Sequence, residues 1–240
     1  MKDGMKDGLW AATFQERDNR SPAVSVSGLA TPSMADIALT WTPKDTAVHI
    51  LDTCPTPLAV CREVLPLREQ DKLIQADVLD IKSLETHARE VGGYSAIITD
   101  AFLTRFSDEE KRIVLRNLTQ VLRKDGVLIT TWRIKESIEG EDDSVDAKER
   151  RKKIFIQNVA SRAKELNVSF TMDYISAAWE YAERMTSHSS QNEEEIKAML
   201  ENYFEDVTVE PEYMRVYDVS TKRYALVLAK RPKKDNGKKG

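Results

Sequence analysis

Residues 107–134 read SDEEKRIVLRNLTQVLRKDGVLITTWRI, a helix pattern that runs directly into a strand pattern. Ser107 and Glu110 have the spacing of a capping box at the start of the helix. Apolar residues then recur at helical spacing and predict one buried face: Val114, Leu115, Leu118, Val121 and Leu122. We expect Gly126 to end the helix. The apolar run 126–134 that follows predicts a buried strand.

Four short apolar runs precede this unit, and each ends in a turn-like sequence: residues 23–28, 47–52, 73–81 and 94–102. They show little polar alternation, which is typical of strands that are covered on both faces and hence of a parallel sheet. Helix patterns separate them, and the first presents Met34, Ile37, Ala38 and Trp41 as one apolar stripe. Alternating strands and helices predict an α/β fold with a doubly wound sheet.

The alternation breaks after Ile134. Residues 136–144 are acidic and predict a mobile loop, and residues 145–188 contain two helix patterns with no strand between them. After a further helix pattern, strand patterns at 206–219 and 222–231 follow each other directly, so we expect them to pair antiparallel. The sequence therefore predicts a mostly parallel sheet that ends in an antiparallel hairpin, with a helical insertion after the fifth strand.

Composition favours one globular domain. The chain has 240 residues, of which 41% are hydrophobic and 32% charged, and this length suffices for one large core. We expect an N-terminal arm at 1–22, a domain at 23–231 that contains a cap at 145–188, and a basic, disordered tail at 232–240. Two cysteines are too few for a disulfide framework and the N-terminus lacks a signal-peptide pattern, which together predict a cytoplasmic protein.

The same composition argues against several partners. No apolar run approaches the roughly 20 residues that cross a bilayer, and a net charge of −4 does not suggest a general nucleic-acid surface. The basic residues 230–239 are a candidate contact for an anionic polymer, although such tails are more often solvated ends. The sequence contains no clustered set of metal ligands, and no motif indicates an oligomeric state.

Ligands of a doubly wound sheet bind beyond the carboxyl ends of its strands, so the residues after each strand are candidates for a site. Gly28 and Ala30 follow the first strand in a turn of small residues, where backbone N–H groups can approach a ligand. A tight strand-to-helix turn is the alternative. Asp52 ends the second strand 24 positions after Gly28, a spacing that suits an acceptor for both hydroxyls of a ribose. A cap for the next helix is its alternative role.

Two further strand ends carry carboxylates. Asp77 and Val78 follow the third strand, and a carboxylate with an apolar neighbour suits an adenine amino group and its ring. Asp100 follows the fourth strand, where it is placed to orient an amino group of a ligand. A turn cap is the alternative for Asp100.

The chain resembles the class I S-adenosylmethionine-dependent methyltransferases over residues 23–134 and again over 204–231. The resemblance rests on the order SGLATPSMADIA, HILD, QADV, YSAIITDAFLTRFS and EEKRIVLRNLTQVLRKDGVLITTWR. It implies a seven-stranded sheet with an antiparallel last strand, S-adenosylmethionine as cofactor, and methyl transfer to an acceptor. It also implies the cofactor residues Gly28, Ala30, Asp52, Thr53, Asp77, Val78, Asp100 and Ala101. The sequence departs from the family pattern at Val26, where an acidic residue is often found, and at Ala30 and Pro32, where glycines are expected.

The resemblance directs the search for an acceptor site to the N-terminal arm and to the residues after the fifth strand. Aromatic candidates are Trp10 and Phe14 in the arm, Tyr174 and Trp179 in the cap, and Trp132 in the fifth strand itself. They suit a small, partly apolar acceptor, although aromatics at helical spacing are also typical of packing. His188 is the candidate general base, while a lone exposed histidine is the commoner case. Methyl transfer from a sulfonium depends mainly on proximity and alignment, so it does not require a dedicated catalytic residue.

Other functions share parts of this pattern. A nicotinamide-dependent oxidoreductase uses a similar glycine turn and acidic residue, but the antiparallel strands at the end of the chain and the incomplete glycine pattern argue against it. A non-catalytic binding module with an altered cofactor loop is a second alternative. A third is an enzyme that uses the same cofactor for another reaction, such as aminopropyl transfer.

Overall fold

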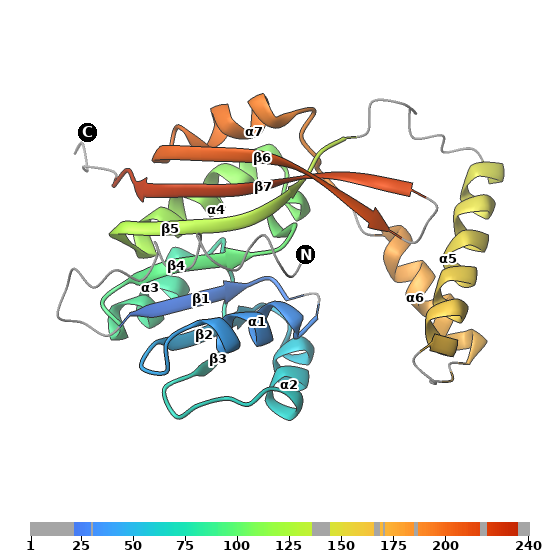
Figure 1. Cartoon of the computed structure of the whole chain (residues 1–240), viewed down its shortest axis with the longest axis horizontal. Helices are drawn as coiled ribbons and strands as arrows, with labels where there is room; N and C mark the ends of the chain where they lie inside the picture. Colours follow the sequence, from blue (N-terminus) through green and yellow to red (C-terminus); the bar gives the residue numbers. More distant parts are fainter. Residues whose placement is uncertain are drawn as a thin grey trace.

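The computed structural model describes residues 22–29, 31–135, 145–165, 169, 171–184, 187–216 and 220–234. Its seven strands form one sheet in the order β3-β2-β1-β4-β5-β7-β6 (Figure 1). Five strands pair in parallel: β1 (Ala23–Ser27), β2 (Ala47–Asp52), β3 (Lys72–Gln75), β4 (Tyr94–Thr99) and β5 (Leu122–Arg133). Strand β7 (Ser220–Pro232) lies antiparallel between β5 and β6 (Phe204–Val216). The predicted doubly wound, seven-stranded sheet with an antiparallel last strand is confirmed.

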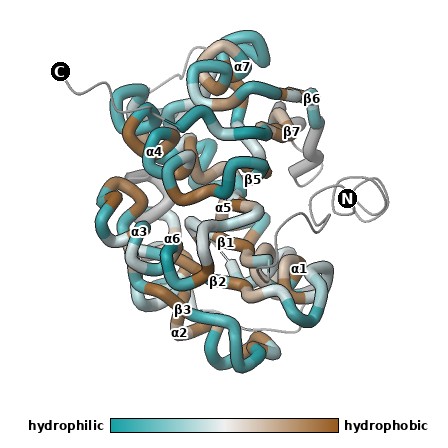
Figure 2. The backbone as a smooth tube through the Cα atoms, turned by 90° about the vertical axis from the view of Figure 1, so that its left-hand side faces the viewer, coloured by the Kyte–Doolittle hydropathy of each residue, from teal (hydrophilic) through white to brown (hydrophobic). Residues whose placement is uncertain are grey.

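Helices cover both faces of the sheet (Figures 1 and 2). One face packs against α1 (Ser33–Trp41) and α2 (Pro55–Val64), through core residues such as Ala38 and Leu58. The other packs against α3 (Ile81–Glu90), α4 (Asp108–Val121) and α7 (Glu193–Leu200), through residues such as Leu84, Leu115 and Ile196. Two buried faces explain why the strands of the sequence show so little polar alternation.

Helix α4 begins as predicted and ends earlier. The Ser107 N–H donates to Glu110 Oε2 at 2.8 Å and the Glu110 N–H donates to Ser107 Oγ at 3.3 Å, which completes the capping box. All five residues of the predicted face are buried. Gly126, however, does not end the helix. Leu122 is already extended and pairs with Tyr94, so Gly126 lies inside β5.

The apolar stripe predicted for α1 is correct for Met34 and Ala38 and wrong for Ile37 and Trp41. Ala35, Ala38 and Leu39 face the sheet, whereas the Ile37 and Trp41 side chains are 41% and 43% exposed. The sheet-facing positions are i, i+3 and i+4, the spacing of one helix face. Small alanine side chains at this face let α1 lie close to the strands.

Two helices follow β5, α5 (Val145–Glu165) and α6 (Met172–Arg184), and they contact each other through the rings of Phe155 and Trp179, whose centroids are 5.5 Å apart. Figure 1 shows this pair beyond the arrowheads of β1 and β6, at the carboxyl edge of the parallel strands. The loop predicted at 136–144 and the arm at 1–21 lie outside the described residues. None of the helices described has both the length and the apolar character needed to cross a membrane.

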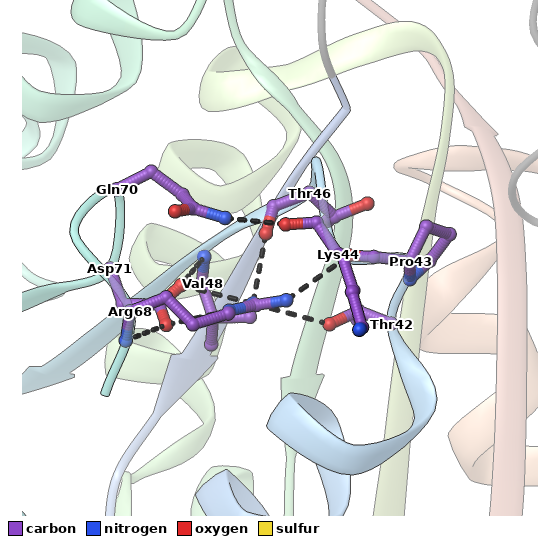
Figure 3. A network of polar contacts seen from close by, with 8 residues as sticks. All are labelled: Thr42, Pro43, Lys44, Thr46, Val48, Arg68, Gln70 and Asp71. Carbon is purple, nitrogen blue, oxygen red and sulfur yellow. Dashed lines mark hydrogen bonds and ion pairs between the residues drawn. The ribbon is translucent and has the colours of Figure 1, made fainter. Parts of the chain in front are cut away.

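A partly buried ion pair joins two loops at the opposite, amino edge of the sheet (Figure 3). The Arg68 guanidinium donates to both oxygens of Asp71, at 2.9 and 3.0 Å, and to the carbonyl oxygen of Thr46 at 2.9 Å. Asp71, whose side chain is fully buried, also accepts from the N–H of Val48 at 2.9 Å. These bonds fix the segments that enter β2 and β3, and hence the positions at which both strands end.

Candidate functional site

A pocket of about 100 Å³ lies at the carboxyl edge of β1, β2 and β3. Five of its lining residues are predicted cofactor residues: Gly28, Asp52, Thr53, Asp77 and Val78. Leu51, Ala76, Phe102 and Phe106 complete the wall. Residues from four separate segments of the chain therefore meet where the sheet topology places a ligand.

Gly28 and Asp52 form the centre of this pocket. Gly28 has φ +76°, a conformation that favours glycine, and its N–H donates to the Leu51 carbonyl at 3.1 Å. Asp52 Oδ2 accepts from the N–H of Leu29, and Oδ1 accepts from the N–H of Cys54, each at 2.8 Å. Asp52 therefore ties the turn after β1 to Cys54, the residue before α2, but it does not cap that helix, whose N-cap Cys54 makes no side-chain cap bond. Each carboxylate oxygen keeps a second lone pair.

Asp77 and Val78 have different surroundings at the end of β3. Asp77 is exposed, and its Oδ1 accepts from the N–H of Leu79 at 2.9 Å, which closes a local turn. Val78 is 4% exposed, and its carbonyl oxygen accepts from Asn117 Nδ2 at 2.9 Å. The valine side of the pocket is thus fixed to α4, while the carboxylate reaches solvent.

Asp100 and Ala101 follow β4 but do not line the pocket. The Thr131 hydroxyl donates to Asp100 Oδ1, and the Ala101 N–H donates to Thr131 Oγ1 at 2.8 Å. Ala101 has φ +48° and leads into the 3-10 helix η1 (Phe102–Arg105). This turn projects Phe102 from the end of β4 toward the turn after β1.

Phe102 and Phe106 are the pocket residues that the sequence analysis missed. Their rings meet edge to face with centroids 5.0 Å apart. A Cβ atom placed on Gly28 would lie 2.0 Å from Cδ2 of Phe102, so the phenyl ring itself fills the space that glycine leaves open. The pocket is smaller than small-molecule sites, which hold roughly 300–1,000 Å³, and the Phe102 ring lies beside Gly28 in it. An aromatic residue three positions after a strand end is the signal that marks it in the sequence.

Trp132, predicted to contact an acceptor, is instead a core residue. It is fully buried on the face of β5 that α4 covers, with Lys111 Nζ 5.6 Å from its ring centroid. Its indole N–H has no hydrogen-bond partner in the part of the chain that the structure describes. Strand β5 continues to Arg133, so residue 132 still alternates into the covered face.

The backbone of His188 is anchored at this edge of the sheet. Its N–H donates to the Thr104 carbonyl at 2.7 Å and its own carbonyl accepts from Lys111 Nζ at 2.7 Å. Lys111 also donates to Asp108 Oδ1 at 2.8 Å, which holds the pKa of that carboxyl below its usual range. His188 is therefore attached to η1, the element that carries Phe102 into the pocket.

The acceptor candidates on α6 do not line the pocket. Tyr174 on α6 is 66% exposed, and Trp179 is half-buried against Phe155. The packing alternative thus describes Trp179. Trp10, Phe14 and Ala30 lie outside the described residues. Among the described residues, no three His, Cys, Asp or Glu side chains are grouped as metal ligands.

No model of a protein family matches the chain, and no curated protein matches it in sequence. Solved structures do match. An O-methyltransferase family protein from Burkholderia thailandensis is 14% identical with a TM-score of 0.53, over 94% of this chain and 53% of its own. The CurJ carbon methyltransferase is 16% identical with a TM-score of 0.57, over 92% of this chain and 51% of its own. This chain thus spans about half the length of these two proteins.

A third match covers more of its partner. The N-methyltransferase NodS from Bradyrhizobium japonicum WM9, in complex with S-adenosyl-L-homocysteine, is 12% identical with a TM-score of 0.51, over 88% of this chain and 79% of its own. The matched proteins methylate different atoms, and what they share with this chain is the arrangement of the sheet and its helices. The chain has the fold of the class I S-adenosylmethionine-dependent methyltransferases.

Proposed function

We propose that the chain binds S-adenosylmethionine in the pocket around Gly28 and Asp52 and transfers its methyl group to a small-molecule acceptor. The pocket is the observation that carries the proposal. It combines a glycine with positive φ after β1, a carboxylate at the end of β2, and a carboxylate beside an apolar wall after β3. A nucleoside needs the same three features: close backbone approach, a ribose acceptor and a face for the base.

Each residue has an assigned part in binding. Asp52 accepts from the ribose hydroxyls with the lone pairs that its two backbone bonds leave available. Val78 contacts the adenine ring, Asp77 accepts from its amino group, and Asp100 orients the methionine amino group. The bound cofactor supplies an electrophilic methyl group on a positively charged sulfur.

We assign the acceptor side to α5 and α6, which act as a lid. Their position beyond the carboxyl edge supports this assignment (Figure 1). The exposed aromatic ring of Tyr174 on α6 suits a small, partly apolar acceptor. His188 is the candidate to take up a proton from the acceptor. Alignment of the acceptor with the methyl group supplies much of the rate enhancement.

A non-catalytic binding module is the second candidate, and the Phe102 ring against Gly28 favours it. If the Phe102 ring stays beside Gly28, it excludes the cofactor from the backbone of the turn after β1. The nicotinamide alternative fits less well. In dinucleotide-binding sheets the strand order is 3-2-1-4-5-6, whereas an antiparallel strand separates β5 from β6 here.

Thermal-shift and calorimetric titrations with S-adenosylmethionine, S-adenosylhomocysteine and NADH test these candidates together. Both sulfur compounds should raise the unfolding temperature and release or absorb heat, because they bind only the folded state. NADH should do neither. Stabilisation by NADH alone would indicate the oxidoreductase, and no stabilisation by any of the three would leave the non-catalytic module. Mass analysis of a small-molecule acceptor library then identifies methyl transfer and distinguishes it from aminopropyl transfer.

Both cysteines are free, with Cys54 exposed and Cys61 buried. Burial raises the pKa of the Cys61 thiol, and the nearby Asp52 carboxylate raises it further. A neutral, buried thiol is inert. Free thiols support the proposal that the protein works in the reducing cytoplasm.

A further inference from the structure

A second pocket, of about 420 Å³, lies at the amino edge of the sheet. One side of α4 from Arg112 to Thr119, the turn after α7 and the residues that follow β7 enclose it. Helix α4 runs back from the carboxyl edge, and β7 is antiparallel to its neighbour β5, so both end at the amino edge. Figure 1 shows the arrowhead of β7 at the opposite end of the sheet from the arrowheads of β1 and β6. This pocket is therefore separate from the proposed cofactor site.

Half of the lining residues are cationic and none is acidic. Arg112 and Arg116 lie one turn apart on the same side of α4, and Lys233 and Lys234 follow the end of β7. The remaining lining residues are neutral and include Tyr203. Four positive charges around one pocket attract an anion strongly.

Neutral carbonyl groups hold the two lysines in place. Lys234 Nζ donates to the carbonyl oxygens of Thr119 at 2.8 Å and Gln120 at 3.1 Å, in the last turn of α4. Lys233 Nζ donates to the carbonyl oxygen of Glu201 at 2.6 Å. The Glu201 carboxylate itself lies 3.8 Å from Lys197. The described residues Pro232–Lys234, expected to be a disordered tail, are thus fixed to the body of the protein.

The charge of Lys234 carries a cost in this position. Burial lowers the pKa of its ammonium group, because the positive form loses contact with water. Its three N–H groups donate to the carbonyl oxygens of Thr119, Gln120 and Leu122, so it attracts an anion through its charge. The protein thus holds cationic side chains close together before a ligand binds.

We propose that this pocket binds a small organic molecule that carries phosphate. Two arginines form the planar forks that bind phosphate oxygens in pairs, and lysines add point charges. The volume exceeds that of a phosphate group alone and falls within the range of small-molecule sites. Tyr203 and Met199 provide a less polar wall for the organic part. The proposal does not depend on the proposed methyltransferase activity.

Isothermal titration calorimetry with ADP on the full chain tests the proposal. ADP should bind, and binding should weaken at high ionic strength because the contacts are between charges. The Arg112→Gln/Arg116→Gln variant should lose about tenfold or more in affinity. The matched variant Arg62→Gln/Arg150→Gln removes two exposed arginines from α2 and α5 and should bind ADP as the wild type does.

Further arms identify what the pocket recognises. Adenosine should not bind there, and inorganic phosphate should bind more weakly than ADP. Arg112→Gln alone should reduce affinity in the same direction if the double variant fails to fold. Asp52→Ala should leave ADP affinity unchanged, because Asp52 lines the other pocket.

The proposal is overturned if ADP does not bind, or if the arginine variants bind it normally. If adenosine bound as tightly as ADP, the pocket would not recognise phosphate. If inorganic phosphate bound as tightly as ADP, the pocket would not recognise the organic part of the ligand. Loss of ADP binding in Asp52→Ala would place ADP in the cofactor pocket instead. A single-stranded RNA that binds more tightly than ADP, and is released by the same arginine variants, would make this face a nucleic-acid surface.

Discussion

Replacement of Asp52 by alanine tests the proposed cofactor site most directly. Each carboxylate oxygen already accepts one backbone N–H, from Leu29 or Cys54 at 2.8 Å, and so has one lone pair left for a ribose hydroxyl. Asp52→Ala therefore removes two charge-assisted hydrogen bonds from the complex. Because water competes for this half-exposed carboxylate, we expect a loss of about 2–4 kcal/mol in binding, or about 30- to 900-fold in affinity.

The same substitution affects the free protein. The N–H groups of Leu29 and Cys54 both lose their acceptor, and Leu29 is 7% exposed. We expect the free energy of unfolding to fall by about 1–2 kcal/mol. Asp80→Ala is a matched control, because Asp80 accepts from the Lys82 N–H at 3.0 Å as the cap of α3 and does not line the pocket. It should lower stability by about 1 kcal/mol and leave binding unchanged.

Calorimetric titration with S-adenosylhomocysteine measures the first quantity and urea unfolding the second. A folded Asp52→Ala protein that binds S-adenosylhomocysteine as the wild type does would refute the assignment of Asp52 to the ribose. A loss of binding that Asp80→Ala shares would trace the effect to stability instead. The assignment therefore stands only if binding and stability separate in the two variants.

Four further changes have expected outcomes. Phe102→Ala should raise S-adenosylhomocysteine affinity about tenfold by calorimetry, because the ring no longer has to leave the glycine turn; weaker binding would show that the ring contacts the ligand. Asp71→Ala should lower the free energy of unfolding in urea by about 3 kcal/mol, since it leaves Arg68 without its buried acceptor; a change below about 1 kcal/mol would contradict this. The buried His49 has a pKa lowered to about 4, mainly by burial and then by Lys72. The free energy of unfolding should therefore be unaffected by this residue above pH 6.5 and should fall by up to about 3 kcal/mol as the pH drops toward 4. His49→Gln should reduce that fall in unfolding measured against pH. Deleting 145–184 and joining the ends with a Gly/Ser linker should keep S-adenosylhomocysteine binding and abolish product formation, whereas loss of binding would show that these helices belong to the cofactor site.

Local patterns were sufficient to predict the sheet because strands such as β1, β2 and β4 are buried on both faces and therefore read as short apolar runs. The capping box at Ser107 and Glu110 placed the start of α4 correctly. It was harder to predict which face of a helix or strand each residue occupies. Trp132 lies inside the strand predicted at 126–134, and the local sequence does not show which of the two faces of β5 is covered there. In α1 the large apolar residues Ile37 and Trp41 are exposed while alanines face the sheet, so size was a poor guide to orientation.

The shape of the pocket was harder to predict, because it depends on a contact between residues 28 and 102, which follow the neighbouring strands β1 and β4. Sequence position predicted the carboxylates at strand ends, since the carboxyl edge of a doubly wound sheet gathers whatever follows each strand. It could not predict that the first residue of η1 projects its ring into the space left by Gly28, because that depends on the left-handed turn at Ala101 and its bonds to Thr131. The fold determines where the proposed nucleoside site lies, and the Phe102 side chain on a short turn lies against the backbone of Gly28. The two proposed functions therefore differ in what they require of the Phe102 ring. A methyltransferase requires the ring to move, and a non-catalytic binding module does not.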